Sequence, residues 1–187
     1  MRVLVAGASG VLGRRLVPML VGAGHEVVGT TRTQTKVELL RALGARPVVL
    51  DALDRDAVLR AVDEARPEVV VHQLTALPDM IDPRRLAKDF ALTNRLRTEG
   101  TDHLLAAARE AAVRRFVAQG FAGWTVPMVE RAARNAAVGA AEERRLDERP
   151  GGGDPAIGAA FTEGLRSLSA ARRHLEDAVT GAEWTEG

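Results

Sequence analysis

The sequence predicts an α/β fold, a doubly wound parallel sheet with helices on both faces, followed by a helical segment. Over the first two-thirds of the chain, short apolar runs alternate with amphipathic stretches, which is typical of repeated strand–helix units around a parallel sheet. The first apolar run leads directly into a glycine-rich turn with the spacing G-x-x-G-x-x-G at residues 7–13. After Trp124 the pattern changes, and the chain becomes rich in alanine and arginine.

The alternating pattern predicts five strands and four helical stretches. The strands are expected at residues 3–6, 27–30, 47–50, 69–72 and 115–119. The helical stretches are expected at residues 11–21, 35–43, 54–64 and, as one long helix, 83–111. Gly44 is placed to end one helix in a left-handed cap, and Asp82 with Pro83 to cap and begin another. Right-handed crossovers then give the strand order 3-2-1-4-5.

The carboxyl-terminal third is predicted to be helical. Residues 129–148 contain no strand-like run and have the composition of a helix. A Pro-Gly-Gly-Gly-Asp-Pro segment at 150–155 interrupts the chain, and a final amphipathic helix is expected over 161–179. We therefore expect a sheet-containing domain over residues 1–124 and a helical extension over residues 125–187.

Composition excludes several classes of function. The 187 residues suffice for one sizeable core, and 26 basic against 25 acidic residues give a net charge of +1, which attracts neither nucleic acid nor an anionic membrane. The absence of cysteine excludes disulfides, thiolate zinc sites and cysteine nucleophiles, and fits a cytoplasmic location. The four histidines lack metal-ligand spacing, so no metal site is expected. With no signal segment and no apolar run near the roughly 20 residues that span a bilayer, a soluble, unprocessed protein is expected.

The glycine turn predicts a dinucleotide site. Gly7 would make the tight turn, Gly10 would admit a pyrophosphate against bare backbone, and Gly13 would let the next helix pack close to the strand. The amides at the start of that helix would face the phosphates.

The end of the second predicted strand indicates which dinucleotide is bound. A protein selective for NAD places an acidic residue there to bond the ribose hydroxyls, whereas this chain reads Gly-Thr-Thr-Arg at 29–32. Arg32 can pair with a 2′-phosphate, which favours NADP as the cofactor, with NAD as the alternative. The competing interpretation makes Arg32 an ordinary solvated arginine.

Residues after the third and fourth strands would lie on the same edge of the sheet. Asp51, Ala52 and Leu53 could hold an adenine through a carboxylate contact and an apolar side, although Asp51 or Asp54 could instead be a helix cap. His72 ends the fourth strand, where a lone histidine is more often a satisfied core residue than an acid or base.

Together these motifs resemble the extended short-chain dehydrogenase/reductase family, the NAD-dependent epimerase/dehydratase group. The resemblance covers residues 1 to about 124 and rests on residues 7–13, 51–53, 69–74, 93–94, 100–101 and 114–119, which occur in the family's order. It implies a Rossmann fold that binds a dinucleotide. The cofactor-binding positions it implies are Gly7, Ser9, Gly10, Val11, Leu12, Gly13, Arg32, Asp51, Ala52, Leu53, Leu74, Thr75, Ala76 and Asn94.

The family's catalytic positions do not carry over to this chain. In the family a serine or threonine follows the fifth strand and a Tyr-x-x-x-Lys pair lies on the next helix. This chain reads Gln-Gly-Phe-Ala-Gly-Trp at 119–124, contains no tyrosine, and has its two lysines upstream at Lys36 and Lys88. We therefore predict no catalytic residue and expect an NAD(P)-binding protein without the usual catalysis, such as a redox-sensing module. The alternatives are an active NADP-dependent oxidoreductase or nucleotide-sugar epimerase, and a non-catalytic truncated product.

The carboxyl-terminal part departs from the family and then returns to it. Residues 125–160 do not resemble the family, whereas residues 174–179 resemble its helix before the sixth strand. A local change of reading frame and a diverged helical insertion both explain this gap, and residues 125–187 could be the remnant of a truncated substrate domain. The substrate is therefore not predicted. Family members often dimerise through helices corresponding to 83–111 and to the one after residue 124, so a homodimer is an open expectation.

Overall fold

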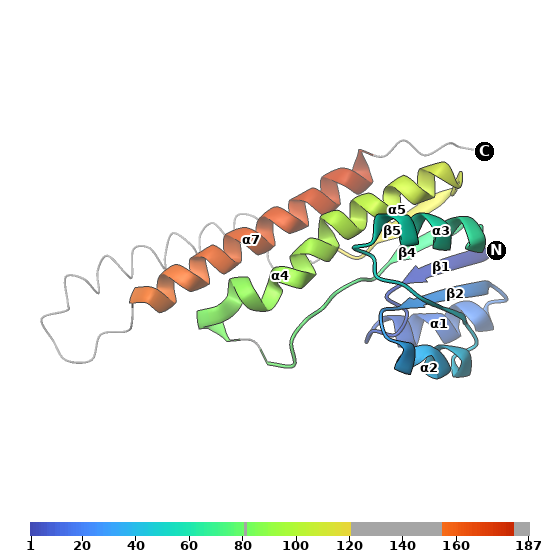
Figure 1. Ribbon diagram of the computed structural model, residues 1–187, viewed down its shortest axis with the longest axis horizontal. Coiled ribbons are helices and arrows are strands. Elements are labelled where there is room, and N and C mark those ends of the chain that lie inside the picture. The colour runs from blue at the N-terminus through green and yellow to red at the C-terminus, as the bar shows by residue number, and fades with distance from the viewer. Residues whose placement is uncertain (81, 121–154, 182–187) are drawn as a thin grey trace, which may run out of the picture. The chain divides into compact units, whose positions relative to one another are not determined.

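The computed structural model describes residues 1–80, 82–120 and 155–181. Its five strands are β1 (Arg2–Ala6), β2 (Glu26–Thr31), β3 (Arg46–Val49), β4 (Val69–His72) and β5 (Arg115–Ala118). They form one sheet in the order β3-β2-β1-β4-β5, in which every neighbouring pair is parallel. This arrangement confirms the predicted fold class and strand order (Figure 1).

Helices cover both faces of the sheet. The described helices are α1 (Gly13–Gly22), α2 (Val37–Ala42), α3 (Arg55–Ala65), α4 (Leu86–Arg97), α5 (Glu99–Glu110) and α7 (Pro155–Thr180), with 3-10 turns η1 (Gln34–Lys36) and η2 (Pro83–Arg85). In Figure 1, α1 and α2 lie on one side of the sheet, and α3 and α5 lie on the other. No helix in the described part of the chain is both long enough and apolar enough to cross a membrane.

The long helix expected over residues 83–111 is divided. After η2, α4 ends at Arg97 and α5 begins at Glu99, because Thr98 between them has φ −98° and ψ −85°. The Thr98 hydroxyl donates a hydrogen bond to the carbonyl oxygen of Arg95, 3.3 Å away, a bond to the preceding turn that slightly destabilises a helix.

Of the two helices predicted in the carboxyl-terminal third, one lies within the described residues. The helix expected over 161–179 lies within the longer α7, whereas the one expected over 129–148 falls outside the described residues. Asp82 caps η2 by accepting from the amide of Arg84, and Gly44 follows α2 with φ +87°, as expected.

The chain divides into two compact units. The described residues of the first unit are 1–75, 95–120 and 174–181, which include the whole sheet. Alternation along β1 sends Val3 and Val5 into a cluster with Val17 of α1 and Leu40 of α2. Leu4 between them is fully buried on the opposite side of β1, the side that α3 and α5 cover. The described residues of the second unit are 76–80, 82–94 and 155–173.

Candidate dinucleotide-binding site

Gly7 makes a turn that a residue with a side chain could not make without strain. It follows β1 directly and has φ +87°, in the left-handed region that favours glycine. A Cβ on Gly7 would lie 2.9 Å from the carbonyl oxygen of Gln73, after β4. The Gly7 amide donates to Thr30 Oγ1 at 3.1 Å, which ties the turn to the end of β2.

Gly10 and Gly13 shape the rest of the turn. The Gly10 amide donates to the Gly7 carbonyl oxygen at 3.0 Å, and a Cβ on the exposed Gly10 would meet only that same oxygen, at 3.2 Å. A Cβ on Gly13 would lie 2.5 Å from the carbonyl oxygens of both Gly7 and Ala8. The turn is therefore open toward solvent at Gly10 and closely packed at Gly13.

The start of α1 provides an environment suited to an anion. Within the described part of the chain, the amides of Val11 and Leu12 donate to no protein atom, and the helix has neither a side-chain cap nor an acidic residue in its first turn. The side chains of Val11 and Leu12 are 72% and 49% exposed. Unpaired amides at the positive end of a helix dipole bind phosphate groups in other proteins.

The end of β2 carries hydroxyl groups beside an exposed cation. Ser9 Oγ, from the glycine turn, lies 3.0 Å from Thr31 Oγ1, and the amide of Thr33 donates to the same hydroxyl at 3.4 Å. Arg32 is exposed and forms no ion pair with any described residue. Arg32 directly follows the hydroxyl that bonds Ser9, and its exposed guanidinium has its donors available to a ligand.

The segment after β3 contains two aspartates with different local roles. Asp54 is the N-cap of α3, because its Oδ1 accepts from the amide of Ala57 at 3.0 Å. Asp51 lies outside the helix and accepts from the amide of Leu53 at 3.0 Å, which closes a short turn around the buried Ala52. Of the two caps considered from the sequence, only Asp54 caps the helix.

His72 is a satisfied core histidine, the ordinary interpretation of its position in the sequence. It is buried, its Nδ1 accepts from the amide of Leu74 at 3.1 Å, and its Nε2 lies 3.0 Å from Thr101 Oγ1. The Thr101 hydroxyl donates to the carbonyl oxygen of Arg97 at 2.8 Å, so it accepts from a neutral ring that carries its proton on Nε2. Burial, with a smaller contribution from the nearby Arg97 charge, lowers the pKa of His72 to about 4.

The structure brings most of the predicted cofactor residues to one edge. The glycine turn, Arg32, the 51–53 segment, Leu74 and Thr75 all belong to the first unit and follow the carboxyl ends of β1, β2, β3 and β4. Ala76 and Asn94 belong to the second unit. There the Ala76 amide donates to Thr93 Oγ1 at 2.9 Å, and the buried Asn94 donates through Nδ2 to Ser167 Oγ of α7 at 2.8 Å.

One histidine at this edge was missed by the sequence reasoning. His103 of α5 lies with its Nδ1 3.0 Å from the carbonyl oxygen of Ala52. No local pattern indicates this bond, because its partners are 51 residues apart in the chain.

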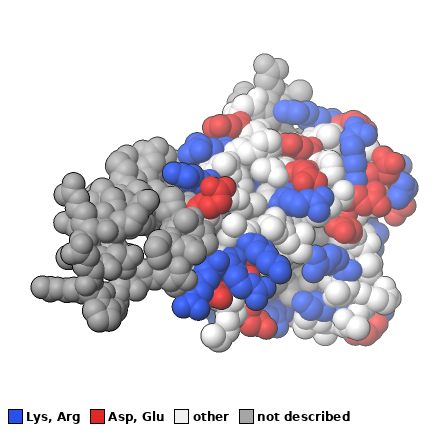
Figure 2. All heavy atoms as spheres, turned by 60° about the vertical axis from the view of Figure 1, so that its left-hand side comes forward, with Lys and Arg blue, Asp and Glu red and all other residues white. Residues whose placement is uncertain are grey.

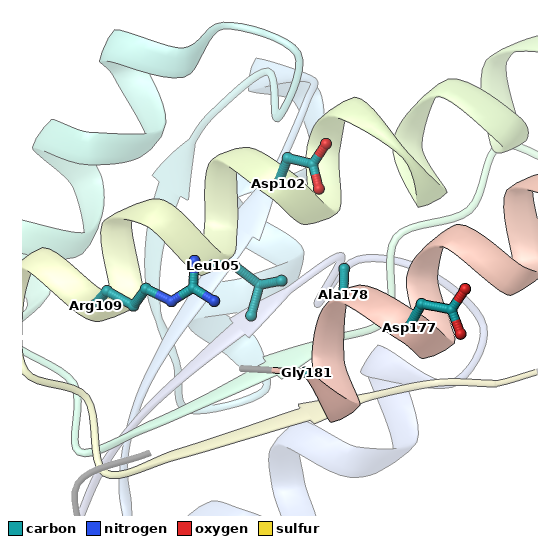
Figure 3. Close-up of a pocket in the computed structure, with 6 residues that line it drawn as sticks. All are labelled: Asp102, Leu105, Arg109, Asp177, Ala178 and Gly181. Atoms are coloured by element: carbon teal, nitrogen blue, oxygen red, sulfur yellow. The ribbon is translucent and has the colours of Figure 1, made fainter. Parts of the chain in front are cut away.

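A separate cavity of about 400 Å³ lies between α5 and the end of α7 in the first unit (Figure 3). Its lining residues are Asp102, Leu105, Arg109, Asp177, Ala178 and Gly181. None of them is a predicted cofactor residue, and Asp102 is already paired with His174 Nε2 at 2.8 Å.

The described residues form no metal-ligand cluster, and the face drawn in Figure 2 carries charges of both signs. The described residues contain no group of three or more side chains that could hold a metal ion. On the face shown in Figure 2, basic and acidic side chains lie side by side over most of the described surface, in keeping with the net charge of +1.

Comparison with known proteins identifies the family. The model of the NAD dependent epimerase/dehydratase family matches residues 3–124, which contain β2 to β5 and all of β1 except Arg2. This chain belongs to the NAD dependent epimerase/dehydratase family.

Three individual proteins are similar to this chain. The chain is 54% identical over 127 residues to a 3-diazoavenalumate denitrifying reductase of a Streptomyces species, a match that covers 68% of this chain and 40% of the reductase. The enzyme WbmG of Bordetella bronchiseptica, solved in complex with NAD and UDP, is 25% identical with a TM-score of 0.53 over 90% of this chain and 49% of WbmG. The UDP-glucose 4-epimerase of Thermus thermophilus, solved with NAD, has the same fold with a TM-score of 0.55 at 22% identity, over 94% of this chain and 52% of the epimerase.

Two facts about these three similar proteins bear on function. Both of the solved structures hold NAD, so structural neighbours of this chain bind a nicotinamide dinucleotide. The match covers between 40% and 52% of the length of the three proteins, so a large part of each has no counterpart in these 187 residues.

Proposed function

We propose that this chain binds NADP(H) at the carboxyl edge of its sheet and does not catalyse hydride transfer by a Tyr/Lys mechanism. The observation that carries this proposal is the glycine turn. Gly7 lies in the left-handed region, Gly10 is open, and the amides of Val11 and Leu12 donate to no described protein atom at the start of α1.

The described residues fit the parts of the cofactor. The amides of Val11 and Leu12 would hold the pyrophosphate, and Arg32, which follows the Thr31 hydroxyl in the chain, would pair with the 2′-phosphate. The turn at 51–53 would hold the adenine, and the backbone at Leu74 and Thr75 would line the nicotinamide side. A binding domain over residues 1–124, and roles for Ala76 and Asn94 in it, remain proposals that rest on the family resemblance.

Catalysis by the family's usual route lacks its acid/base group here. The bound cofactor would supply or accept the hydride, and a phenol with a lowered pKa would move the proton beside it. These 187 residues contain no tyrosine, and both lysines precede β5 in the chain. His72 does not replace the phenol, because both of its ring nitrogens are engaged in the core.

The second candidate is an NADPH-dependent reductase. The 54% identity to the 3-diazoavenalumate denitrifying reductase favours it, because this similarity is more than twice that to WbmG or to the UDP-glucose 4-epimerase. A substrate of the same kind, a diazo compound, would then be reduced with NADPH as the reductant.

One experiment separates the two candidates. The purified chain is titrated with NADPH by fluorescence, and NADPH consumption is then followed by absorbance with and without 3-diazoavenalumate. Saturable binding without consumption supports the first candidate, and consumption that depends on the diazo compound supports the second. Absence of NADPH binding overturns both.

A further inference from the structure

Helix α5 contacts the turn that follows β3 through one histidine. His103, half-buried on α5, places Nδ1 3.0 Å from the carbonyl oxygen of Ala52. Ala52 is the central residue of the Asp51–Leu53 turn and is itself buried. Because a carbonyl oxygen only accepts hydrogen bonds, the His103 ring must donate from Nδ1.

The turn is held from two directions. Within it, Asp51 Oδ1 accepts from the amide of Leu53, and the carbonyl oxygen of Asp51 accepts from the amide of Asp54 at 3.1 Å. From outside, α5 backs the turn at Gly100, where a Cβ would lie 3.7 Å from Ala52 Cβ and 3.8 Å from its carbonyl oxygen. Three residues later, on the same face of the helix, His103 supplies a hydrogen bond.

We infer that His103 is a positioning residue for cofactor binding, which acts by fixing the main chain of Ala52 and so the adenine-binding face of the 51–53 turn. This inference rests on the proposed function. His103 itself binds no part of the cofactor and reaches the turn from α5. Loss of its hydrogen bond would leave the Ala52 carbonyl oxygen buried without this donor and allow the turn to shift.

The protonated ring and one of the two neutral tautomers can both make this bond. A neutral His103 donates from Nδ1 when that nitrogen carries the proton, and a protonated ring carries protons on both nitrogens. The tautomer can be read directly in the wild-type protein by two-dimensional ¹H–¹⁵N NMR of the imidazole ring. A neutral His103 that carries its proton only on Nε2 would overturn the inference without any substitution.

The test compares His103→Ala with His103→Asn. An asparagine Nδ2 occupies nearly the same place as the histidine Nδ1, so it can restore the hydrogen bond to Ala52. Dissociation constants are measured for NADPH and for adenosine 2′,5′-bisphosphate, which contains only the adenine half of the cofactor. His174→Ala is the matched control, because it also removes a histidine hydrogen bond to α5, the one to Asp102, but leaves the turn untouched.

We expect His103→Ala to weaken both ligands by the same factor of about 5 to 10, the effect of one net hydrogen bond. His103→Asn should recover most of that loss, and His174→Ala should stay within about twofold of wild type, below the worth of a net hydrogen bond. A purely structural role predicts a lower melting temperature with unchanged affinities. If the wild type binds NADPH and the alanine variant binds it equally well, the role of His103 is refuted while the proposed function stands. If the wild type binds neither ligand, the proposed function fails with it.

Discussion

Arg32 is the residue to which we assign the choice between the two dinucleotides. It is exposed at the end of β2, beside the glycine turn, and forms no ion pair with the described residues. A carboxylate at this position would instead accept bonds from the ribose hydroxyls of NAD and repel a 2′-phosphate.

Arg32→Asp should therefore weaken NADPH far more than NADH. Loss of a charge-assisted contact and introduction of repulsion should cost at least about 2 kcal/mol for NADPH, roughly a 30-fold rise in dissociation constant. Fluorescence titration with both nucleotides measures the difference. Arg60→Asp, on the exposed side of α3, applies the same change of net charge away from the turn and should alter neither constant appreciably. Equal losses for both nucleotides in Arg32→Asp would refute the assignment.

His72 couples the stability of the fold to pH. Its pKa is about 4 in the folded protein, below the ordinary value of 6.5 that applies after unfolding. The unfolded chain therefore binds a proton first as the pH falls, and stability contributed by the neutral ring is lost from about pH 6.5 downward.

Between pH 8 and pH 5 this single histidine should remove on the order of 2 kcal/mol from the free energy of unfolding. Urea denaturation at both pH values measures the loss in the wild type and in His72→Gln, which keeps polar atoms for Leu74 and Thr101 without titrating in this range. At pH 8 the variant should have a smaller free energy of unfolding than the wild type. Between pH 8 and pH 5, however, its free energy of unfolding should fall by less than that of the wild type. The same pH dependence in both proteins would show that titratable groups other than His72 determine how stability changes with pH.

Three helices of the first unit end in the same hydrogen-bonding motif with different residues at its critical position. After α1, α2 and α5, two successive amides bond back into the last turn, at Gly24 and His25, at Gly44 and Ala45, and at Ala112 and Val113. The first residue of each pair lies in the left-handed region, with φ +80° at Gly24, +87° at Gly44 and +50° at Ala112. This is the Schellman motif, which favours glycine because a Cβ is strained there.

Ala112→Gly should therefore stabilise the protein by about 0.5 to 1 kcal/mol, and Gly24→Ala should destabilise it by about 1 kcal/mol. Gly24 is the cleaner partner for this comparison, because a Cβ there would meet no atom within 4 Å and only backbone strain changes. Denaturant unfolding of the two variants and the wild type measures whether each substitution raises or lowers the free energy of unfolding. A destabilised Ala112→Gly would mean that lost chain entropy outweighs the relieved strain.

The same three helix ends show where sequence reasoning succeeds at the scale of an element. Gly44 signals its left-handed conformation through its residue type, whereas Ala112 adopts a similar conformation without any such signal. The boundary at Thr98 was missed for a related reason, since threonine is tolerated inside helices and only the backbone angles of Thr98 mark the break.

At the scale of the whole molecule, the sheet was predictable because its signals are local and repeated. Apolar runs mark all five strands, and the glycine turn after the first strand favours the Rossmann order over other orders that right-handed crossovers allow. The glycine turn was predictable for the same reason, since its residues are consecutive. The bonds from His72 to Thr101 and from His103 to Ala52 join residues 29 and 51 positions apart, and only the folded chain reveals them.

Cofactor binding should stabilise the chain as a whole, because the proposed site exists only when β1, β2 and β3 are assembled. A ligand that binds the folded state alone adds about 2.7 kcal/mol at a concentration 100 times its dissociation constant. For a chain of 187 residues this corresponds to a rise of about 5 to 10 °C in melting temperature.

A thermal scan with NADPH at that concentration measures the rise, and NADH at the same concentration should give a smaller one if Arg32 selects the 2′-phosphate. In Arg32→Asp the larger rise with NADPH should disappear or be replaced by a larger rise with NADH, because a carboxylate there repels the 2′-phosphate. CMP, which lacks the nicotinamide half, the adenine and a 2′-phosphate, serves as the control for unspecific stabilisation by a nucleotide. An unchanged melting temperature at NADPH concentrations that saturate the fluorescence titration would place NADPH binding outside the folded sheet edge, because ligand bound only by the native site must shift unfolding upward.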